Sequence, residues 1–291
     1  MLENYNKSFK ERDDLGIPPL PLSAEQTSEL VELIKKENSK ELLDLLINRV
    51  PAGVDDAAYV KAAFLADISQ RKIQCELISP KEATFYLGTM LGGYNVEPLI
   101  NLIDDQECGE IAVEALSKTL LIFDAFNDIA DLSNESDNAK KILNSWAEAE
   151  WFLSKPEIPD LIKTTVFKVP GETNTDDLSP APDAWSRPDI PLHALAMYKM
   201  PREGISKPIE TISKLKEKGF PVALVGDVVG TGSSRKSATN SVLWHMGEEI
   251  PFIPNKKTGG ICIGGKIAPI FFNTMEDAGT IVFEADVEKM N

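Results

Sequence analysis

The sequence contains few of the residues from which metal and redox sites are built. Its 291 residues include three cysteines, Cys75, Cys108 and Cys262, which are far apart and form no C-x-x-C pair. Isolated cysteines of this kind are usually small core residues. The two histidines, His193 and His245, have no histidine partner at ligand spacing. The sequence therefore predicts no metal site within this chain.

Long apolar runs are also missing. No run approaches the roughly 20 residues that a helix needs to span a bilayer. The first seven residues lack the basic and apolar regions of a signal peptide. Apolar residues make up 43% of the chain and charged residues 26%, as in ordinary globular proteins. These features predict a cytoplasmic protein without membrane contact.

Positive charge is scarce in the first half of the chain. Residues 1–160 carry 30 acidic and 15 basic side chains, a balance of −15, whereas residues 161–291 carry 16 and 15, a balance of −1. An acidic surface disfavours indiscriminate nucleic-acid binding, which depends on Lys and Arg at phosphates. The nearly neutral second half is where an anionic ligand could be tolerated.

Residues 1–153 have helical hydrophobic spacing and no convincing strand. Capping boxes begin two of the expected helices, Ser23 with Gln26 and Ser79 with Glu82, and the second of these helices is expected to end at Gly92. About eight short helices suit a HEAT-like or armadillo-like α-solenoid, with a compact helical bundle as the alternative. An acidic run over residues 104–135 is typical of a solvated face, and a partner-docking surface is its alternative.

Beyond a proline-containing linker at residues 154–163, the pattern changes. Residues 164–169 alternate as in a strand, and a long polar loop is expected over residues 171–191. Further strands are predicted at residues 222–225, 261–263 and 281–285, with helices near 208–218 and 267–277. Alternating strands and helices predict an α/β domain over residues 164–291.

A glycine-rich segment joins the strand at residues 222–225 to a helix that runs past Trp244. Ser233, Ser234 and Arg235 stand at its tip. Glycine allows positive φ and close backbone approach, and a helix N-terminus attracts anions. The segment fails the P-loop pattern and the dinucleotide fingerprint, because Arg235 occupies the position where each requires glycine. An anion other than a nucleotide is therefore expected.

Two interpretations of the serines remain open at this point. Arginine binds carboxylates in a bidentate way, and a serine can act as a base if its oxyanion is held by N–H groups, a helix N-terminus and Arg235. Such a serine could remove a proton next to a carboxylate. Alternatively, Ser233 and Ser234 only cap the helix.

Three segments of the second half resemble the swivelling domain of the aconitase superfamily. Residues 226–235 resemble its active-site loop, residues 264–274 resemble the segment that follows, and residues 171–182 resemble its TTD-x-I/L-S-P-A loop. A HEAT-like helical domain before a swivelling domain is the arrangement of the bacterial B-type branch of that superfamily. The resemblance covers essentially the whole chain.

The resemblance implies reversible isomerisation of citrate and isocitrate through cis-aconitate. The sequence does not decide whether 2-methylisocitrate is also a substrate. It implies that Ser233 is the catalytic base, and that Ser234, Arg235 and Arg187 bind substrate carboxylates. Asp176 and its neighbour Asp177 are expected to shape the wall of the site rather than to bind anions. Relatives of this kind use a [4Fe-4S] cluster as Lewis acid.

None of the three cysteines lies in a matching cluster motif, so the cluster ligands are expected outside this chain. The chain is therefore expected to be an N-terminal piece that is inactive without the remaining aconitase domains. The resemblance also implies two further possibilities. One is a homodimer formed through the helical domain, and the other is binding of messenger RNA by an iron-free form. The alternatives are a helical interaction or mRNA-binding regulatory module, and a small subunit of the isopropylmalate isomerase type.

Overall fold

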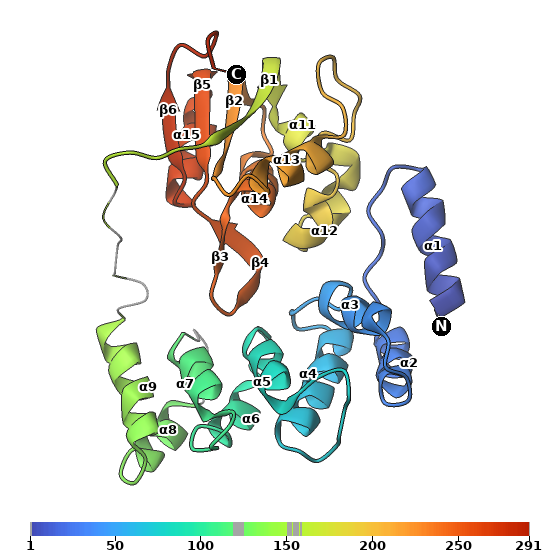
Figure 1. Cartoon of the computed structure of the whole chain (residues 1–291), viewed down its shortest axis with the longest axis vertical. Helices are drawn as coiled ribbons and strands as arrows, with labels where there is room; N and C mark the ends of the chain where they lie inside the picture. Colours follow the sequence, from blue (N-terminus) through green and yellow to red (C-terminus); the bar gives the residue numbers. More distant parts are fainter. Residues whose placement is uncertain (1, 119–124, 150–152, 154–156, 158, 291) are drawn as a thin grey trace. The chain divides into compact units, whose positions relative to one another are not determined.

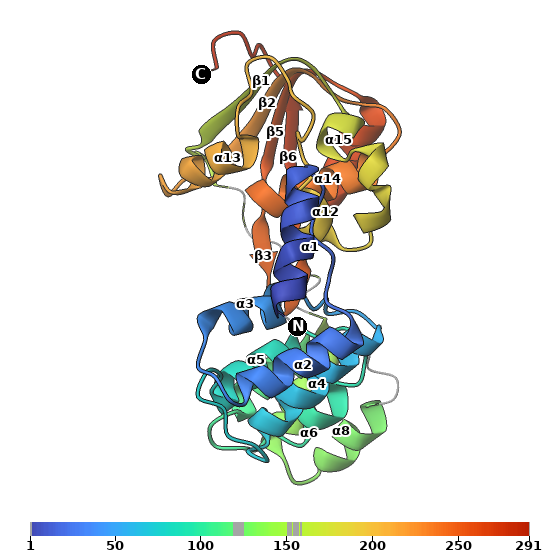
Figure 2. The same ribbon diagram turned by 90° about the vertical axis from the view of Figure 1, so that its right-hand side faces the viewer.

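The computed structural model describes residues 2–118, 125–149, 153, 157 and 159–290. Their contacts divide them into two compact units, one helical and one α/β (Figures 1 and 2). The helical unit begins at Leu20, and the α/β unit combines residues 2–19 with the chain from Pro159 onward. The predicted linker includes residues 154–156 and 158, which lie outside the described residues. Every helix that the structure describes is too short or too polar to cross a membrane.

The helical unit consists of short helices that pack on helices close to them in the sequence (Figure 1). Helix α4 packs on α2 and α5, and α7 packs on α5 and α9, so apolar sides are buried between neighbours. The helices are α2 (Ala24–Ile34), α3 (Lys40–Asn48), α4 (Asp56–Ser69), α5 (Pro80–Gly88), α6 (Val96–Ile100), α7 (Gly109–Ser117), α8 (Phe126–Leu132) and α9 (Asp137–Glu148).

Both predicted capping boxes are present. The Ser23 hydroxyl accepts a hydrogen bond from the backbone N–H of Gln26 (3.2 Å), and the Gln26 side chain accepts one from the backbone N–H of Ser23 (2.9 Å). Ser79 and Glu82 make the same pair of bonds at the start of α5. These two predictions are confirmed because capping is a local interaction between residues three positions apart.

The predicted end of α5 at Gly92 is wrong, since the helix ends at Gly88. The Asn95 side chain donates hydrogen bonds to the carbonyl oxygens of Leu87 (3.0 Å) and Met90 (2.9 Å). Carbonyls at a helix end have no partner within the helix. Asn95 therefore satisfies carbonyls at the end of α5 from a position seven residues beyond it.

The α/β unit contains a parallel sheet in the order β1-β2-β5-β6. Its strands are β1 (Thr165–Asn174), β2 (Val222–Thr231), β5 (Ile261–Ile267) and β6 (Ile281–Glu284), and β3 (Glu248–Ile250) pairs with β4 (Ile253–Thr258) in a hairpin. The helices are α1 (Leu2–Asp14), α11 (Thr175–Leu178), the 3-10 helix η1 (Ala181–Ser186), α12 (Ile190–Ala194), α13 (Pro208–Lys216), α14 (Arg235–Met246) and α15 (Pro269–Asp277). The predicted α/β class of this half is confirmed.

Successive residues of β2 pack alternately on the two faces of the sheet. Val222 and Leu224 belong to the larger core, to which α14 and α15 contribute buried side chains. Ala223 and Val225 belong to a smaller cluster on the opposite face. Alternation along a strand buried on both faces gives such a continuous apolar run. The larger core holds α14, and hence the start of α14, in place at the end of β2.

Two predictions about loops need correction. The chain from residue 171 to 191 is not a long loop, because β1 continues to Asn174 and α11, η1 and α12 follow. Prolines stand in the first turn of η1 and of α12, where a missing N–H costs nothing. The segment from Gly226 to Thr231 is likewise the second half of β2.

Candidate functional site

The carboxyl ends of β1 and β2 lie side by side, because Asn174 pairs with Thr231. Helix α11 follows the first strand, and a turn over residues 232–234 leads from the second strand into α14. Ligands of parallel α/β sheets commonly bind at the carboxyl ends of the strands. Two motif segments that are far apart in the sequence therefore meet at the edge of the sheet where a ligand site is expected.

Two glycines bring the turn close to its neighbours. Gly230 and Gly232 have φ of +82° and +107°, conformations that other residues rarely adopt. A Cβ atom on Gly232 would lie 2.4 Å from the Thr175 hydroxyl oxygen, and one on Gly230 would lie 2.2 Å from the ring of Phe271. The Thr175 hydroxyl also accepts a hydrogen bond from the backbone N–H of Ser234 (3.2 Å). The start of α11 thus fixes the turn before α14.

The serines at the tip do not cap α14 through their side chains. Ser234 is the N-cap residue and makes no side-chain capping bond, while Ser233 is exposed one position earlier. The capping interpretation left open by the sequence therefore does not describe the observed contacts. The first N–H groups of α14 remain available at the positive end of the helix dipole.

Arg187 links the two motif segments. Its Nε donates a hydrogen bond to the Ser179 hydroxyl (3.2 Å), and its Nη2 donates to the Ser179 carbonyl oxygen (3.1 Å) and to the Ser234 hydroxyl (2.8 Å). The Ser179 hydroxyl donates to Ser237 Oγ (2.7 Å), and Ser237 Oγ donates to the Ser234 carbonyl (3.1 Å). These bonds close a ring of four residues around the base of the turn.

Arg235 lies beside the same turn. Its Nη1 donates a hydrogen bond to the carbonyl oxygen of Gly232 (3.0 Å), and its side chain remains partly exposed. The predicted substrate-binding residues, Arg187, Ser234 and Arg235, together with exposed Ser233, are therefore gathered at one place. Two guanidinium groups and a helix N-terminus suit a ligand with several carboxylates.

The two aspartates of the first motif segment are arranged differently from one another. Asp176 is exposed, whereas Asp177 accepts a hydrogen bond from the backbone N–H of Asn174 (2.9 Å) and pairs with Arg202 (2.8 Å). Arg202 also donates to the Pro170 carbonyl (2.7 Å). The Asp177 charge is thus matched within the protein. Arg202 was not expected from the sequence, which places it 25 positions from its partner.

His193 on α12 lies behind the ring of hydrogen bonds. It is 2% exposed, its Nε2 is 2.7 Å from the Ser179 hydroxyl oxygen, and its Nδ1 is 2.7 Å from the Ser186 hydroxyl oxygen. Burial and the nearby Arg187 guanidinium lower the pKa of His193 below its ordinary value. His193 lies six residues after Arg187 and is part of no recognised motif, so the sequence did not predict its contacts with Ser179 and Ser186.

The cysteines of this chain do not fit an iron–sulfur cluster. Burial raises the pKa of Cys262 to about 12, which keeps it a thiol, whereas cluster ligands are thiolates. Cys108 is also buried, and Cys75 is half-buried in the helical unit. Across the described residues, His, Cys, Asp and Glu side chains form no group of three or more that could hold a metal ion.

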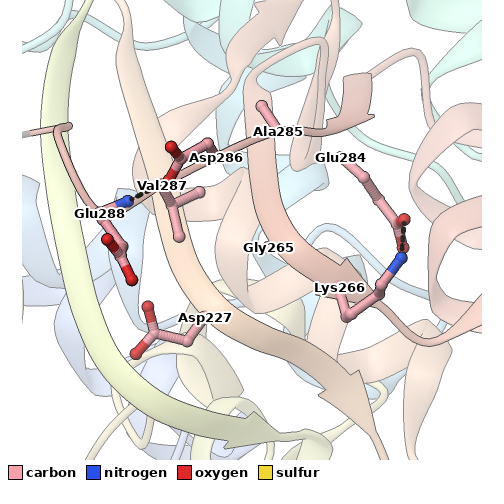
Figure 3. A pocket seen from close by; sticks show the side chains of 8 residues that line it. All are labelled: Asp227, Gly265, Lys266, Glu284, Ala285, Asp286, Val287 and Glu288. Carbon is pink, nitrogen blue, oxygen red and sulfur yellow. Dashed lines mark hydrogen bonds and ion pairs between the residues drawn. The ribbon is translucent and has the colours of Figure 1, made fainter.

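A separate open cleft lies along β5, β6 and the segment that follows β6 (Figure 3). Its charged lining residues are mostly acidic. Asp227 accepts a hydrogen bond from the backbone N–H of Gly171 (2.6 Å), and Glu284 accepts one from Ile267 (2.8 Å) and pairs with Lys266 (3.0 Å). The excess of carboxylates makes this cleft unsuitable for an anionic ligand.

Comparison with protein families gives two matches. The model described as "Aconitate B N-terminal domain" matches residues 4–152, and the model described as "Aconitate hydratase 2 N-terminus" matches residues 164–291. The two matches together leave only short stretches of the chain uncovered.

Curated proteins of three bacteria are similar to the chain over nearly all of its length. It is 59% identical over 302 aligned residues to "Aconitate hydratase B" of Escherichia coli (strain K12), covering 100% of the chain and 35% of that protein. The protein of the same name from Pseudomonas aeruginosa is 59% identical over 297 residues, covering 98% of the chain and 34% of that protein. The one from Helicobacter pylori is 55% identical over 293 residues, covering 99% of the chain and 34% of that protein. The chain thus spans about a third of the length of these relatives.

Proposed function

The chain belongs to the aconitase B family, and on that premise we propose that it is the N-terminal part of an aconitate hydratase, a hydro-lyase. The proposed reaction interconverts citrate and isocitrate through cis-aconitate, with 2-methylisocitrate as a further candidate substrate. The observation that carries the proposal is the meeting of Arg187, Ser234 and the N-terminus of α14 at the carboxyl edge of the sheet, with exposed Ser233 one position before Ser234. These groups suit a ligand with several carboxylates.

We further propose a HEAT-like solenoid for residues 1–153 and a swivelling domain for residues 164–291. Packing of helices on neighbours close in sequence supports the first assignment, since solenoids are built from such contacts. The parallel sheet with its site at the carboxyl ends supports the second. Residues 2–19 are an exception within the first stretch, because they associate with the α/β unit, where the Arg12 guanidinium lies 4.9 Å from the centre of the Trp185 ring.

Substrate carboxylates would bind to Arg187, Arg235 and the N–H groups at the start of α14. Arg187 uses Nε and Nη2 within the protein, which leaves Nη1 to donate to a carboxylate. Its three internal bonds hold the guanidinium in one orientation before the ligand arrives. A guanidinium fixed in advance loses less conformational entropy on binding than a free one.

Ser233 would be the base that removes a proton from the carbon next to a substrate carboxylate. A serine hydroxyl is too weakly acidic to do this in water. Its oxyanion could form at this position if the α14 dipole, the free N–H groups of the first turn and Arg235 stabilise the charge. Ser233 would then carry the proton, while the hydroxyl leaves from the adjacent carbon.

The family resemblance implies a [4Fe-4S] cluster as the Lewis acid of the reaction. Because the cysteines of this chain do not suit a cluster, we propose that its ligands come from other aconitase domains. On this proposal the chain alone does not turn over citrate. A homodimer through the helical unit and binding of messenger RNA remain predictions from the resemblance, without support from the described surfaces.

Citrate titration of the purified chain by isothermal calorimetry tests the proposal. Arg235→Ala should weaken binding by about 1–3 kcal/mol, the usual loss of a charge-assisted hydrogen bond. Ser233→Ala should leave binding unchanged, and it should abolish turnover in an enzyme assembled with the other domains. Lys214→Ala, at an exposed position of α13, is the matched control for the loss of one positive charge. Equal effects of the arginine and lysine changes would contradict the proposed site.

A further inference from the structure

The hydrogen bonds around His193 determine which ring nitrogen carries a proton. Both ring nitrogens face serine hydroxyls, and a hydroxyl offers one proton and two lone pairs. Arginine, by contrast, has only donors. The Ser234 carbonyl at the other end can only accept, so the direction of every bond in the ring of Arg187, Ser179, Ser237 and Ser234 follows from these two ends.

The Ser179 hydroxyl has all of its hydrogen-bonding capacity assigned. It accepts from Arg187 Nε, and it donates its proton to Ser237 Oγ, because the Ser237 proton is itself donated to the Ser234 carbonyl. One lone pair of Ser179 remains, and it faces His193 Nε2 at 2.7 Å. Only a protonated Nε2 can form this bond.

The other ring nitrogen must then be an acceptor if the ring is neutral. The Ser186 hydroxyl is 2.7 Å from both His193 Nδ1 and the Asp183 carbonyl oxygen, and it has one proton to give. The charged groups that face the ring are Arg187 and buried Asp183, which pairs with Lys199 at 3.2 Å. A buried imidazolium beside a guanidinium is disfavoured, so we assign the Ser186 proton to Nδ1 and not to the Asp183 carbonyl, to which the hydroxyl could also donate.

We propose that His193 is a positioning residue whose neutral ring, protonated at Nε2, fixes the Ser179 hydroxyl and thereby directs Arg187 toward the ligand. This role rests on the proposed function, in which Arg187 binds a substrate carboxylate. Without His193, one Ser179 lone pair is left unpaired in a buried place. Ser179 is then held only by Ser237 and Arg187 itself, so the acceptor of the Arg187 Nε–H is less firmly fixed.

Nitrogen-15 NMR of the full chain tests the protonation directly. The sequence contains only two histidines, so a His245→Gln variant assigns the remaining imidazole signals to His193. The expected spectrum shows His193 neutral and protonated at Nε2 at pH 6.5, where an ordinary histidine is half protonated. A ring protonated at Nδ1, or an imidazolium at that pH, would overturn the proposal. Neither result depends on any ligand.

Two substitutions test the positioning role. His193→Phe keeps a ring without either nitrogen, whereas His193→Gln retains a donor that can reach Ser179. His193→Phe should raise the citrate dissociation constant about tenfold, which corresponds to about 1.4 kcal/mol, and should speed hydrogen exchange at Arg187 Nε–H by a similar factor. His193→Gln should restore both to within about threefold of the wild type. Ser241→Ala, which removes a buried hydroxyl without a hydrogen-bond partner among the described residues, is the control and should change neither.

The two readouts separate this inference from the proposed function. Faster exchange at Arg187 in a chain that never binds citrate would support the positioning of Arg187 and contradict the proposed substrate. Unchanged exchange in His193→Phe would overturn the positioning role even if citrate binds. If His193→Phe does not fold, the exchange rate in His193→Gln and the protonation of the wild-type ring decide the question.

Discussion

Arg187 donates a hydrogen bond from Nη2 to the Ser234 hydroxyl at 2.8 Å, across 47 positions of sequence. The bond joins the segment after β1 to the turn after β2, and each segment carries one of the motifs recognised in the sequence. The same serine is the N-cap residue of α14. The arginine therefore positions the helix N-terminus, and on the proposed function it also offers its own charge to a ligand.

Replacing Arg187 by lysine should damage this arrangement although the charge is kept. A lysine amine cannot reach the Ser179 hydroxyl, the Ser179 carbonyl and Ser234 from one planar group. We expect Arg187→Lys to weaken citrate binding by about 1–3 kcal/mol, measured by calorimetry. Lys214→Arg, the reverse exchange at an exposed site, should have no effect. Wild-type affinity in Arg187→Lys would mean that only the charge matters.

Gly232→Ala should destabilise the turn through both its backbone angle and a steric clash. The new Cβ would lie 2.4 Å from the Thr175 hydroxyl oxygen at φ +107°. Gly219 is the matched control, since it has φ +77° but nothing within 4 Å of the added atom. We expect a loss of about 1 kcal/mol in unfolding free energy for Gly219→Ala and a clearly larger loss for Gly232→Ala. Urea denaturation measures both, and equal losses would argue against the close approach of α11.

Lys61 should make the stability of the chain depend on pH in the alkaline range. Its Nζ is buried and donates to the carbonyl oxygens of Val50 (3.1 Å) and Ile47 (3.4 Å), and burial lowers its pKa from 10.5 to about 8. Between pH 8 and 10.5 the folded chain has released this proton while the unfolded chain still binds it. The unfolding free energy therefore rises with pH over that window.

The comparison with Lys61→Met isolates this effect. Wild-type stability should gain about 2–3 kcal/mol relative to the variant between pH 8 and 10.5, as measured by urea denaturation at several pH values. Cys262, whose pKa burial raises to about 12, is common to both proteins and its contribution cancels. A pH-independent difference between the two would show that Lys61 has an ordinary pKa.

Asn95→Ala should destabilise the helical unit. The substitution removes the two side-chain hydrogen bonds to the Leu87 and Met90 carbonyls at the end of α5. The expected cost is about 1–3 kcal/mol, because the Met90 carbonyl loses its side-chain partner, while the Leu87 carbonyl keeps only its bond from the Met90 N–H (3.1 Å). Asn101→Ala, on an exposed residue at the end of α6, is the control and should stay within about 0.5 kcal/mol of the wild type.

Local signals in the sequence predicted the parts of the fold that local physics determines. The capping boxes at Ser23 and Ser79, the strand at Val222 and the turn before Arg235 all depend on residues within a few positions of one another. The residue types that form the capping bonds, and the spacing of the apolar residues, can be read directly from the sequence. The resemblance then indicated which of these elements are expected to form a site.

Contacts between residues far apart in the chain could not be predicted from the sequence. The end of α5 depends on Asn95, and the association of residues 2–19 with the α/β unit depends on contacts such as that between Arg12 and Trp185. The bonds of His193 likewise join residues whose spacing follows no period. Such contacts arise only when tertiary packing brings segments together, so neither propensity nor pattern reveals them.

The contact between Gly230 and Phe271 links unfolding of the turn before α14 to unfolding of the core. Phe271 is fully buried in the larger core of the α/β unit, and the backbone of Gly230 lies directly against its ring. A segment in contact with a core residue cannot fray independently of that core. Amide hydrogens at the start of α14 should therefore exchange only through cooperative opening of the sheet, and the turn before α14 and the sheet would unfold as a single unit.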